Sequence, residues 1–407
     1  MNARSYACDI LYRVIHEGGY ASLLMRNMPS GFSKEDRSLI TEIVYGTLRS
    51  LTLLEYQWKD LSSGSVRRKT AVLINLSVYQ LQYMDRIPAY AVINEAVEAS
   101  PKRDRGFVNA ILRRVLKRGR ILPEGEWPKR EAVLYSHPEF ILRMWEKQYG
   151  RETAIRIAEY DQQRPKLYGR LNTLKADRSF FEVPGVCRIE DDCFTFDGSL
   201  VGSEWLENGL VLIQSRTSQK VVRALDAEPG MRVLDVCAAP GTKTQQIACL
   251  MHNEGSITAG DYYPERVGLI TQLMERTGTG IVTANVRDAA VTHVEDDGAY
   301  DRVLADVPCS GLGDLSHKPE IRFHITPEGL DEITALQKTI LEQSAACVRP
   351  GGILVYSTCT LNRKENEGQI KAFLNAFPAF ELIEEHTLFP FEEESDGFYF
   401  AKMRRMQ

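Results

Sequence analysis

The chain has 407 residues, of which 43% are apolar and 26% are charged, a composition typical of a globular protein with two or three domains. It contains no apolar run of about 18 residues and no signal-like start, so we expect a cytoplasmic protein without a membrane segment. The eight cysteines form no C-x-x-C pair and no cluster with histidine. We therefore expect free thiols, no metal site and no disulfide framework.

Charge is distributed unevenly along the chain. The net charge is −5, yet residues 1–122 carry 19 Lys and Arg against 11 Asp and Glu, a net of +8. The remaining residues carry 31 against 44, a net of −13. A basic module joined to an acidic one suggests that the first contacts a polyanion.

Residues 1–125 are predicted to form an all-α domain, because apolar residues recur at helical spacing from Ala3 to about Arg120. We expect six or seven helices, one of them starting at the capping sequence Ser33-Lys-Glu-Asp36. The last, at 106–118, has a basic face containing Arg113, Arg114, Lys117 and Arg118. A solvated face near a helix C-terminus and an RNA-phosphate surface explain this face equally well. The charge asymmetry favours RNA.

Residues 129–209 are predicted to form a small α+β module. Prolines and a glycine at 122–128 indicate a linker. Helices are expected at 137–150 and then to residue 163, followed by a strand at 166–173 and a loop-rich, short-stranded segment. His137, beside Pro138, is interpreted as a capping or packing residue, because no partner histidine lies nearby in the sequence.

From residue 210 onward, short apolar runs alternate with helical patterns. Strands are predicted at 233–236, 256–259, 281–284, 302–305 and 352–356, a closing strand at 398–402, and helices up to 251 and at 266–277, 326–348 and 365–377. This alternation predicts a mostly parallel sheet with helices on both faces over residues 210–407.

The first of these strands leads into a Pro-Gly loop, Cys237-Ala-Ala-Pro-Gly-Thr-Lys243, and then a helix. The loop lacks the phosphate-cradling and dinucleotide patterns, which favours a ligand without a polyphosphate. Asp261, about 20 residues beyond the glycine turn, is placed to accept hydrogen bonds from ribose hydroxyls. The alternative interpretation is that Asp261, which precedes Pro264, is the N-cap of a helix. Asp288 follows the third strand, where adenine contacts would come from, although a loop aspartate needs no special cause.

Two further strands are each followed by a cysteine, Cys309 or Cys359. The carboxyl ends of parallel strands share one edge, so both thiols should face the same pocket. A thiolate that adds to carbon 6 of a cytosine makes carbon 5 able to attack a methyl donor, and Asp306 is placed to hydrogen-bond ring nitrogen 3. The base must leave its stack to reach such a site. The sequence chemistry does not decide which cysteine attacks.

These motifs carry a resemblance that covers the full chain. The sequence resembles the bacterial RNA cytosine-5 methyltransferases of the Sun (Fmu) type that have a NusB-like helical domain in front. The matching stretches are Cys237 to Lys243, Asp306-Val-Pro-Cys-Ser310, Lys318-Pro-Glu-Ile-Arg322, Ser357-Thr-Cys-Thr360, Glu365-Asn-Glu367, Arg170-Leu-Asn-Thr-Leu174, Ser77 to Pro88, Asn94-Glu-Ala-Val97 and Gly106 to Arg113.

The resemblance implies an N-terminal NusB-like domain, a small α+β module that contacts RNA, and a Rossmann-like methyltransferase domain that uses S-adenosylmethionine. It implies that Cys359 is the nucleophile, that Cys309 assists product release, and that Asp306 lies between cofactor and base. The implied cofactor residues are Cys237, Ala238, Ala239, Pro240, Gly241, Thr242, Lys243, Asp261, Arg266, Asp288 and Asp306. The implied substrate is a cytosine of 16S ribosomal RNA, and the implied enzyme is a monomer without metal.

Other classes of protein are compatible with parts of this pattern. A non-catalytic RNA-binding assembly factor would retain the fold, but the intact Cys359, Cys309 and Asp306 argue against it. A methyltransferase for tRNA, DNA or a small molecule is a further alternative. The basic helical front domain argues against DNA and small molecules.

Overall fold

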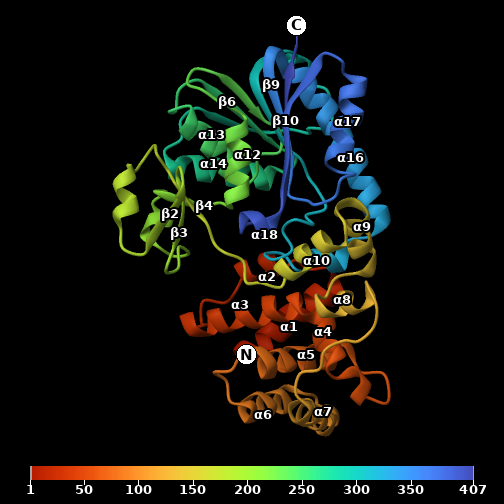
Figure 1. Ribbon diagram of the computed structural model, residues 1–407. Coiled ribbons are helices and arrows are strands. Elements are labelled where there is room, and N and C mark those ends of the chain that lie inside the picture. The colour runs from red at the N-terminus through yellow and green to blue at the C-terminus, as the bar shows by residue number, and fades with distance from the viewer. Residues whose placement is uncertain (1, 407) are drawn as a thin grey trace. The chain divides into compact units, whose positions relative to one another are not determined.

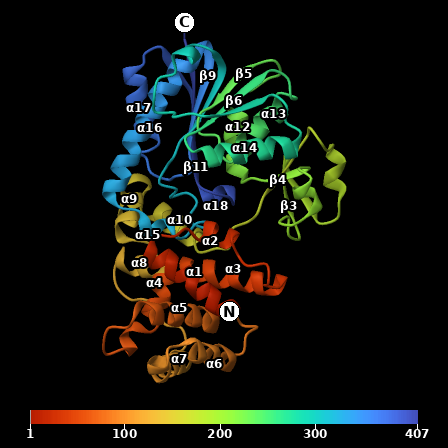
Figure 2. The same ribbon diagram turned by 180° about the vertical axis from the view of Figure 1, so that it is seen from behind.

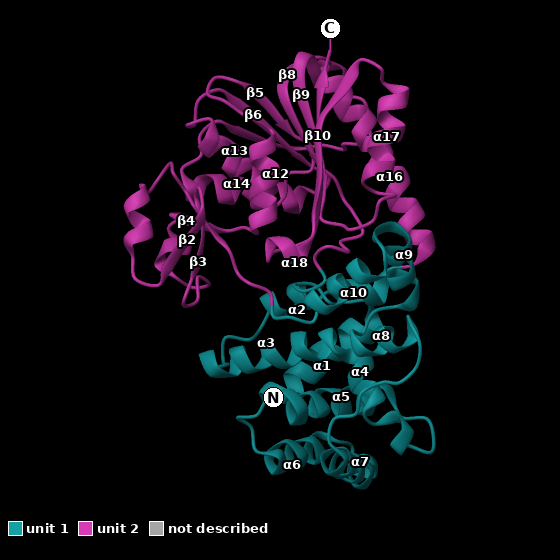
Figure 3. Cartoon of the chain, in the orientation of Figure 1, with its two compact units in different colours: residues 1–164, 315–325 teal, residues 165–314, 326–407 magenta. Residues whose placement is uncertain are grey.

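The computed structural model describes residues 2–406 as two compact units (Figures 1 and 3). The helical unit runs to Arg164 and includes Leu315–Ile325, whereas the sheet unit holds Pro165–Asp314 and the chain from Thr326 onward. These bounds differ from the predicted divisions near 125 and 209. Over the described residues, no helix is long and apolar enough to cross a membrane.

The first part of the helical unit contains seven α-helices, within the predicted six or seven. They are α1 (Ala3–Glu17), α2 (Ala21–Arg26), α3 (Lys34–Arg49), α4 (Leu51–Tyr56), α5 (Arg68–Tyr83), α6 (Ala89–Ala99) and α7 (Arg105–Arg118), with two short 3₁₀ turns, η1 (Lys59–Leu61) and η2 (Lys102–Asp104). Helix α3 begins as predicted, because the Ser33 hydroxyl accepts a hydrogen bond from the Asp36 amide at 3.1 Å.

Three further helices, α8 (Lys129–Leu134), α9 (Glu139–Tyr149) and α10 (Arg151–Tyr160), belong to the same unit. They pack on its core, and the Leu53 amide donates to the Ser136 hydroxyl at 3.2 Å. His137 is buried between the Tyr135 carbonyl and the Asp161 carboxylate. Burial holds the pKa of His137 well below its ordinary value. The prediction that His137 is a packing residue is thus confirmed.

Leu315–Ile325 leaves the sheet unit and becomes part of the helical core. Short helix α15 (Ile321–His324) carries Arg322, which is 1% exposed and donates to the carbonyls of Arg49, Tyr135 and Ser136. Burial lowers the pKa of Arg322 to about 10, so the side chain stays charged. The Glu320 carboxylate accepts the Ala21 amide at 3.0 Å. The segment is therefore a structural part of the helical unit.

The sheet unit begins with a small antiparallel sheet in the order β2-β3-β1-β4. Its strands are β1 (Gly169–Leu171), β2 (Val186–Glu190), β3 (Cys193–Phe196) and β4 (Val211–Ile213), with η3 (Arg178–Glu182) and α11 (Glu204–Glu207) between them. Because β1 pairs with β4, the small sheet extends past residue 209 and is continuous with the chain that enters the large sheet.

The large sheet has seven strands in the order β10-β11-β9-β8-β5-β6-β7. They are β5 (Arg232–Asp235), β6 (Ser256–Asp261), β7 (Val282–Val286), β8 (Tyr300–Asp306), β9 (Val348–Thr358), β10 (Phe380–Leu388) and β11 (Phe398–Arg405). Strands β5 to β9 are parallel, and β11 is antiparallel to β9 and β10. The predicted mostly parallel sheet is confirmed. Strand β10 was not predicted.

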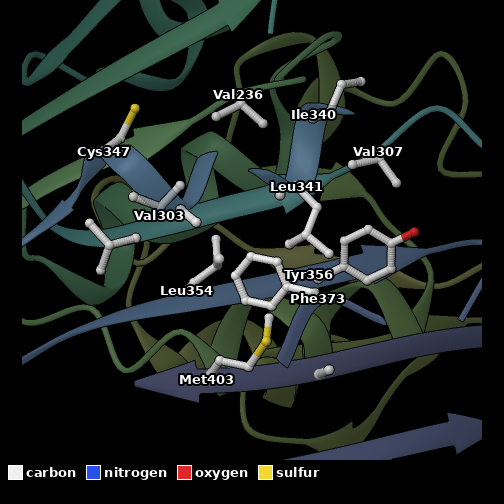
Figure 4. Close-up of a cluster of buried hydrophobic side chains, with 14 of the residues drawn as sticks. Val236, Val303, Val307, Ile340, Leu341, Cys347, Leu354, Tyr356, Phe373 and Met403 are labelled. Carbon is white, nitrogen blue, oxygen red and sulfur yellow. The ribbon is translucent and has the colours of Figure 1, made fainter. Parts of the chain in front are cut away.

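Helices cover both faces of this sheet (Figures 1 and 2). They are α12 (Arg216–Ala224), α13 (Thr242–Leu250), α14 (Pro264–Thr277), α16 (Pro327–Cys347) and α17 (Glu367–Ala376), with η4 (Val294–Asp296) and α18 (Pro390–Glu393) in connections. Alternate residues of β9 face opposite sides. Leu354 and Tyr356 pack with α16 and α17 (Figure 4), whereas Ile353 and Val355 pack with α12 and α13. The sheet is therefore the middle of three layers.

Candidate active site

The carboxyl ends of four parallel strands place polar residues along one edge of the large sheet. Strands β5, β6 and β8 each end on an aspartate, namely Asp235, Asp261 and Asp306. Strand β9 ends at Thr358 and is followed by Cys359. In sheets of this type, ligands bind at this edge. Three carboxylates and a thiol therefore frame one candidate site.

The loop Cys237–Lys243 connects β5 to α13 and is tied to the neighbouring strand. The Ala238 amide donates to the Gly260 carbonyl at 2.8 Å, and the Gly241 amide closes a turn onto the Ala238 carbonyl at 2.8 Å. Gly241 has a φ of 102°, and an added Cβ would lie 3.2 Å from Met274 Cε. Glycine is therefore required where the loop turns into the helix that begins at Thr242.

Asp261 is 3% exposed and faces this loop. Its carboxylate accepts the Ala239 amide at 3.3 Å and the Tyr263 amide at 3.3 Å. Arg266 reaches the same carboxylate at 3.4 Å and the Ala239 carbonyl at 3.3 Å. Helix α14 begins at Pro264 after Tyr263 and has no side-chain cap. The N-cap interpretation of Asp261 is therefore wrong, and Asp261 with Arg266 organises the loop.

Asp288 has a local structural role in the turn after β7. Its side chain accepts the Ala290 amide at 2.9 Å, and its carbonyl contacts His293 Nε2 at 3.0 Å. This geometry is the ordinary behaviour of an aspartate in a turn. It supplies no separate argument for a cofactor contact by Asp288.

Cys309 and Cys359 follow the adjacent strands β8 and β9, and their sulfur atoms lie 3.1 Å apart. Both residues are partly exposed. The contact with Cys359, together with burial, raises the pKa of Cys309 well above its ordinary value. Cys309 is thus held as a neutral thiol, and either sulfur of the pair can donate the hydrogen of this contact.

Asp306 bridges the Pro-Gly loop and β9. The Lys243 ammonium lies 2.7 Å from one carboxylate oxygen, and the Ser357 hydroxyl donates to the other at 2.7 Å. Burial alone would lower the pKa of Lys243, but the charge of Asp306 outweighs it and the pKa is raised. Asp306 therefore joins Lys243 of the loop to Ser357 of β9 through one carboxylate.

Asp235 and Ser357 were not predicted as site residues. Burial raises the pKa of Asp235 to about 7, although the Thr244 hydroxyl donates a hydrogen bond at 2.8 Å that acts to lower the pKa. The signal for Asp235 was its place at a strand end, shared with Asp261 and Asp306. Cys237 adjoins it, and burial raises the pKa of that thiol as well. Ser357 becomes visible only through the register that pairs it with Asp306.

Arg170 of β1 supports the helix behind the loop. Its guanidinium is buried and donates to Gln214 at 2.7 Å, to Gln245 and to the Thr242 carbonyl at 3.4 Å. Asn172 accepts from Gln245 at 2.9 Å and donates to the Thr277 carbonyl at 2.9 Å. This motif is buried inside the sheet unit, so these side chains hold the fold together and do not form an RNA-contact surface.

Fold and site together define a Rossmann-like methyltransferase with a thiol pair at the edge of its sheet. Comparison with known proteins agrees. Residues 222–404 match the family model described as 16S rRNA methyltransferase RsmB/F, and residues 1–117 match the NusB family. The chain is 34% identical to the probable ribosomal RNA small subunit methyltransferase B of Bacillus subtilis, over 99% of both chains.

A second relative, ribosomal RNA small subunit methyltransferase B of Vibrio vulnificus, is 30% identical over 98% of this chain and 99% of its own. Among solved structures, a methyltransferase homologue from Pyrococcus horikoshii is 28% identical and has a TM-score of 0.61, covering 68% of this chain and 98% of its own. The chain belongs to the RsmB/F family of 16S rRNA methyltransferases.

Proposed function

We propose that the protein methylates carbon 5 of a cytosine in small-subunit ribosomal RNA, with S-adenosylmethionine as methyl donor. The observation that carries this proposal is the 3.1 Å thiol pair beside the Lys243–Asp306 ion pair. Methylation of oxygen or nitrogen needs no thiol, whereas carbon 5 of cytosine must first be activated by addition at carbon 6.

The chemistry of the donor set fits this cofactor. S-adenosylmethionine is a cation with a ribose diol and no phosphate, and the carboxylates of Asp261 and Asp306 stand at the strand ends where it would bind. We propose that Cys237, Ala238, Ala239, Pro240, Gly241, Thr242 and Lys243 cover it, with Asp261 and Arg266 on the ribose side. Asp288 and Asp306 complete the proposed set. The cofactor supplies an electrophilic methyl group.

In the proposed mechanism, the Cys359 thiolate forms a bond to carbon 6 while ring nitrogen 3 takes a proton from the Asp306–Lys243 pair. Carbon 5 then carries the electron density for methyl transfer. The carbon 5 proton next leaves to water, the carbon 5–carbon 6 double bond re-forms, and the electron pair of the carbon–sulfur bond returns to Cys359. Ring nitrogen 3 gives its proton back to the Asp306–Lys243 pair. Cys309 donates its S–H to that leaving sulfur, which makes the thiolate a better leaving group.

We further propose that α7 contacts RNA phosphates. Arg118 is neutralised by Asp60, whereas Arg113, Arg114 and Lys117 are exposed and form no ion pair with a described carboxylate. Three unpaired cations on one face suit a polyanion. Replacing Arg113 and Lys117 by alanine should lower the slope of log affinity against log salt by about one per removed contact. An unchanged slope would show that Arg113 and Lys117 of α7 do not contact RNA phosphates.

The test of the main function is transfer of labelled methyl groups to small-subunit ribosomal RNA, followed by bisulfite mapping of 5-methylcytosine. The wild-type protein should modify this RNA and leave DNA of the same sequence unmodified. Cys359→Ala should abolish transfer, whereas Cys309→Ala should accumulate protein-linked RNA. Normal turnover by Cys359→Ala would overturn the assignment of the nucleophile.

A further inference from the structure

Glu365 lies in the turn between β9 and α17 and is completely buried, with 0% of its surface exposed. One carboxylate oxygen accepts the Ser310 amide at 2.9 Å and the Gln337 side-chain amide at 2.9 Å. The other accepts the Ser310 hydroxyl at 2.6 Å and the Asn362 amide at 2.9 Å. Four donors converge on one carboxylate, which satisfies the buried charge.

Two of these four hydrogen bonds come from Ser310, the residue next to Cys309. A main-chain and a side-chain bond to one carboxylate fix both the position and the direction of the peptide that carries the Cys309 thiol. The Ser310 hydroxyl also lies 2.6 Å from the Thr360 hydroxyl, beside Cys359. Glu365 therefore reaches the thiol pair through residues that neighbour each sulfur.

The next residue, Asn366, serves the other cysteine. Its side-chain oxygen accepts the Thr358 hydroxyl at 2.6 Å, and its amide donates to the Thr360 carbonyl at 2.9 Å. Thr358 and Thr360 flank Cys359 on both sides. One turn thus holds the Cys309 loop through Glu365 and the Cys359 loop through Asn366.

We propose that Glu365 is a positioning residue for Cys309, which it keeps within hydrogen-bonding distance of the Cys359 sulfur for the release step. The expected effect on RNA release rests on the proposed function, whereas the expected effect on the distance between the two sulfur atoms does not. Only a carboxylate meets the requirement, because glutamine would turn its NH₂ group toward two of the four donors. A buried mismatch of this kind moves the loop or leaves donors unpaired.

The geometric test uses no RNA. The thiol oxidant diamide takes one hydrogen from each thiol, and a disulfide forms between Cys309 and Cys359 at a rate that depends on their separation. Mass spectrometry of the linked peptide measures this rate. In Glu365→Gln the linkage should form about tenfold more slowly than in the wild type. The matched control is Glu367→Gln at the first residue of α17, where the carboxylate accepts from Thr387; its rate should be unchanged.

The kinetic test separates positioning from general damage. In Glu365→Gln, single-turnover methyl transfer should stay within about twofold of the wild type, while steady-state turnover falls about tenfold and protein-linked RNA accumulates. Asn366→Asp, which sets a carboxylate against the Thr360 carbonyl, should instead slow adduct formation. Equal loss of both steps in Glu365→Gln would overturn the positioning role.

A second variant tests the inference if the first does not fold. If Glu365→Gln does not fold, Ser310→Ala removes one of the two bonds from this residue and should slow diamide linkage and RNA release by a few fold. If a folded Ser310→Ala or Glu365→Gln protein shows wild-type rates of both diamide linkage and RNA release, the positioning role of Glu365 is refuted. Slow linkage in a protein that never forms an RNA adduct would support the geometry while refuting the proposed function.

Discussion

The two halves of the active-site edge are held in place by different segments of the sheet unit. The Pro-Gly loop is tied to β6 by a main-chain hydrogen bond and supported from behind by Arg170. The cysteine loops are joined by a hydrogen bond from the Gly313 amide to the Cys359 carbonyl and by the carboxylate of Glu365. Because these supports come from separate segments, a substitution in one half can leave the other half in place.

Asp306 belongs to both halves, because it contacts Lys243 of the loop and Ser357 of β9. Asp306→Asn removes the ion pair and the proton relay, and should lower the single-turnover rate about 10³-fold. Rapid-quench measurement of methyl transfer provides the check. Asp301→Asn, at the opposite end of β8, is the control and should transfer methyl groups at the wild-type rate. A loss below tenfold in Asp306→Asn would contradict the assigned role.

Asp235 lies next to the Pro-Gly loop, and we expect its ionisation to make the free energy of unfolding depend on pH. Burial raises its pKa from 3.8 to about 7, so the folded protein holds its proton more tightly than the unfolded chain does. Below about pH 4 Asp235 is protonated in both states and does not lower the free energy of unfolding. As pH rises through 7, the need to keep Asp235 protonated or to bury its charge lowers that free energy by about 4 kcal/mol.

Asp235→Asn should remove this dependence, because an asparagine oxygen still accepts from Thr244. The stability gained over the wild type should therefore increase from pH 4 to pH 7, as measured by urea unfolding at several pH values. A gain that is the same at both pH values would show that Asp235 stays ionised, and would contradict the raised pKa.

Arg170→Ala tests whether the loop half is braced from behind. The substitution leaves Gln214, Gln245 and the Thr242 carbonyl without their buried partner and should cost about 3 kcal/mol of unfolding free energy. The dissociation constant for S-adenosylmethionine should rise, while the diamide linkage of Cys309 to Cys359 stays at the wild-type rate. Arg178→Ala, at an exposed arginine, is the control. Equal effects on both halves would refute their independence.

Much of this architecture followed from local sequence patterns. The helices up to residue 118, the parallel strands and the convergence of Asp261, Asp306, Cys309 and Cys359 depend on periodicity and on strand order, both of which the sequence carries. Strand β10 was missed because its inward residues alternate with glutamates and a histidine at the sheet's edge, a pattern without a continuous apolar run.

Long-range contacts account for the remaining differences. Nothing local indicates that Leu315–Ile325 packs into the helical unit, since Arg322 finds its partners some 186 to 273 residues away along the chain. The pairing of Lys243 with Asp306 likewise joins the start of α13 to the end of β8. The four donors to Glu365 come from three separate segments. Such contacts decide which partner Asp306 meets and how far apart the two thiols lie.

The most direct measurement is to identify the cysteine that becomes bound to RNA. Small-subunit RNA containing 5-fluorocytosine traps the adduct, because fluorine cannot leave carbon 5 as a proton does. Nuclease and protease digestion followed by mass spectrometry then locates the linked residue. We predict that the nucleotide is attached to Cys359. Attachment to Cys309, or methyl transfer with no adduct on either sulfur, would contradict the proposed chemistry.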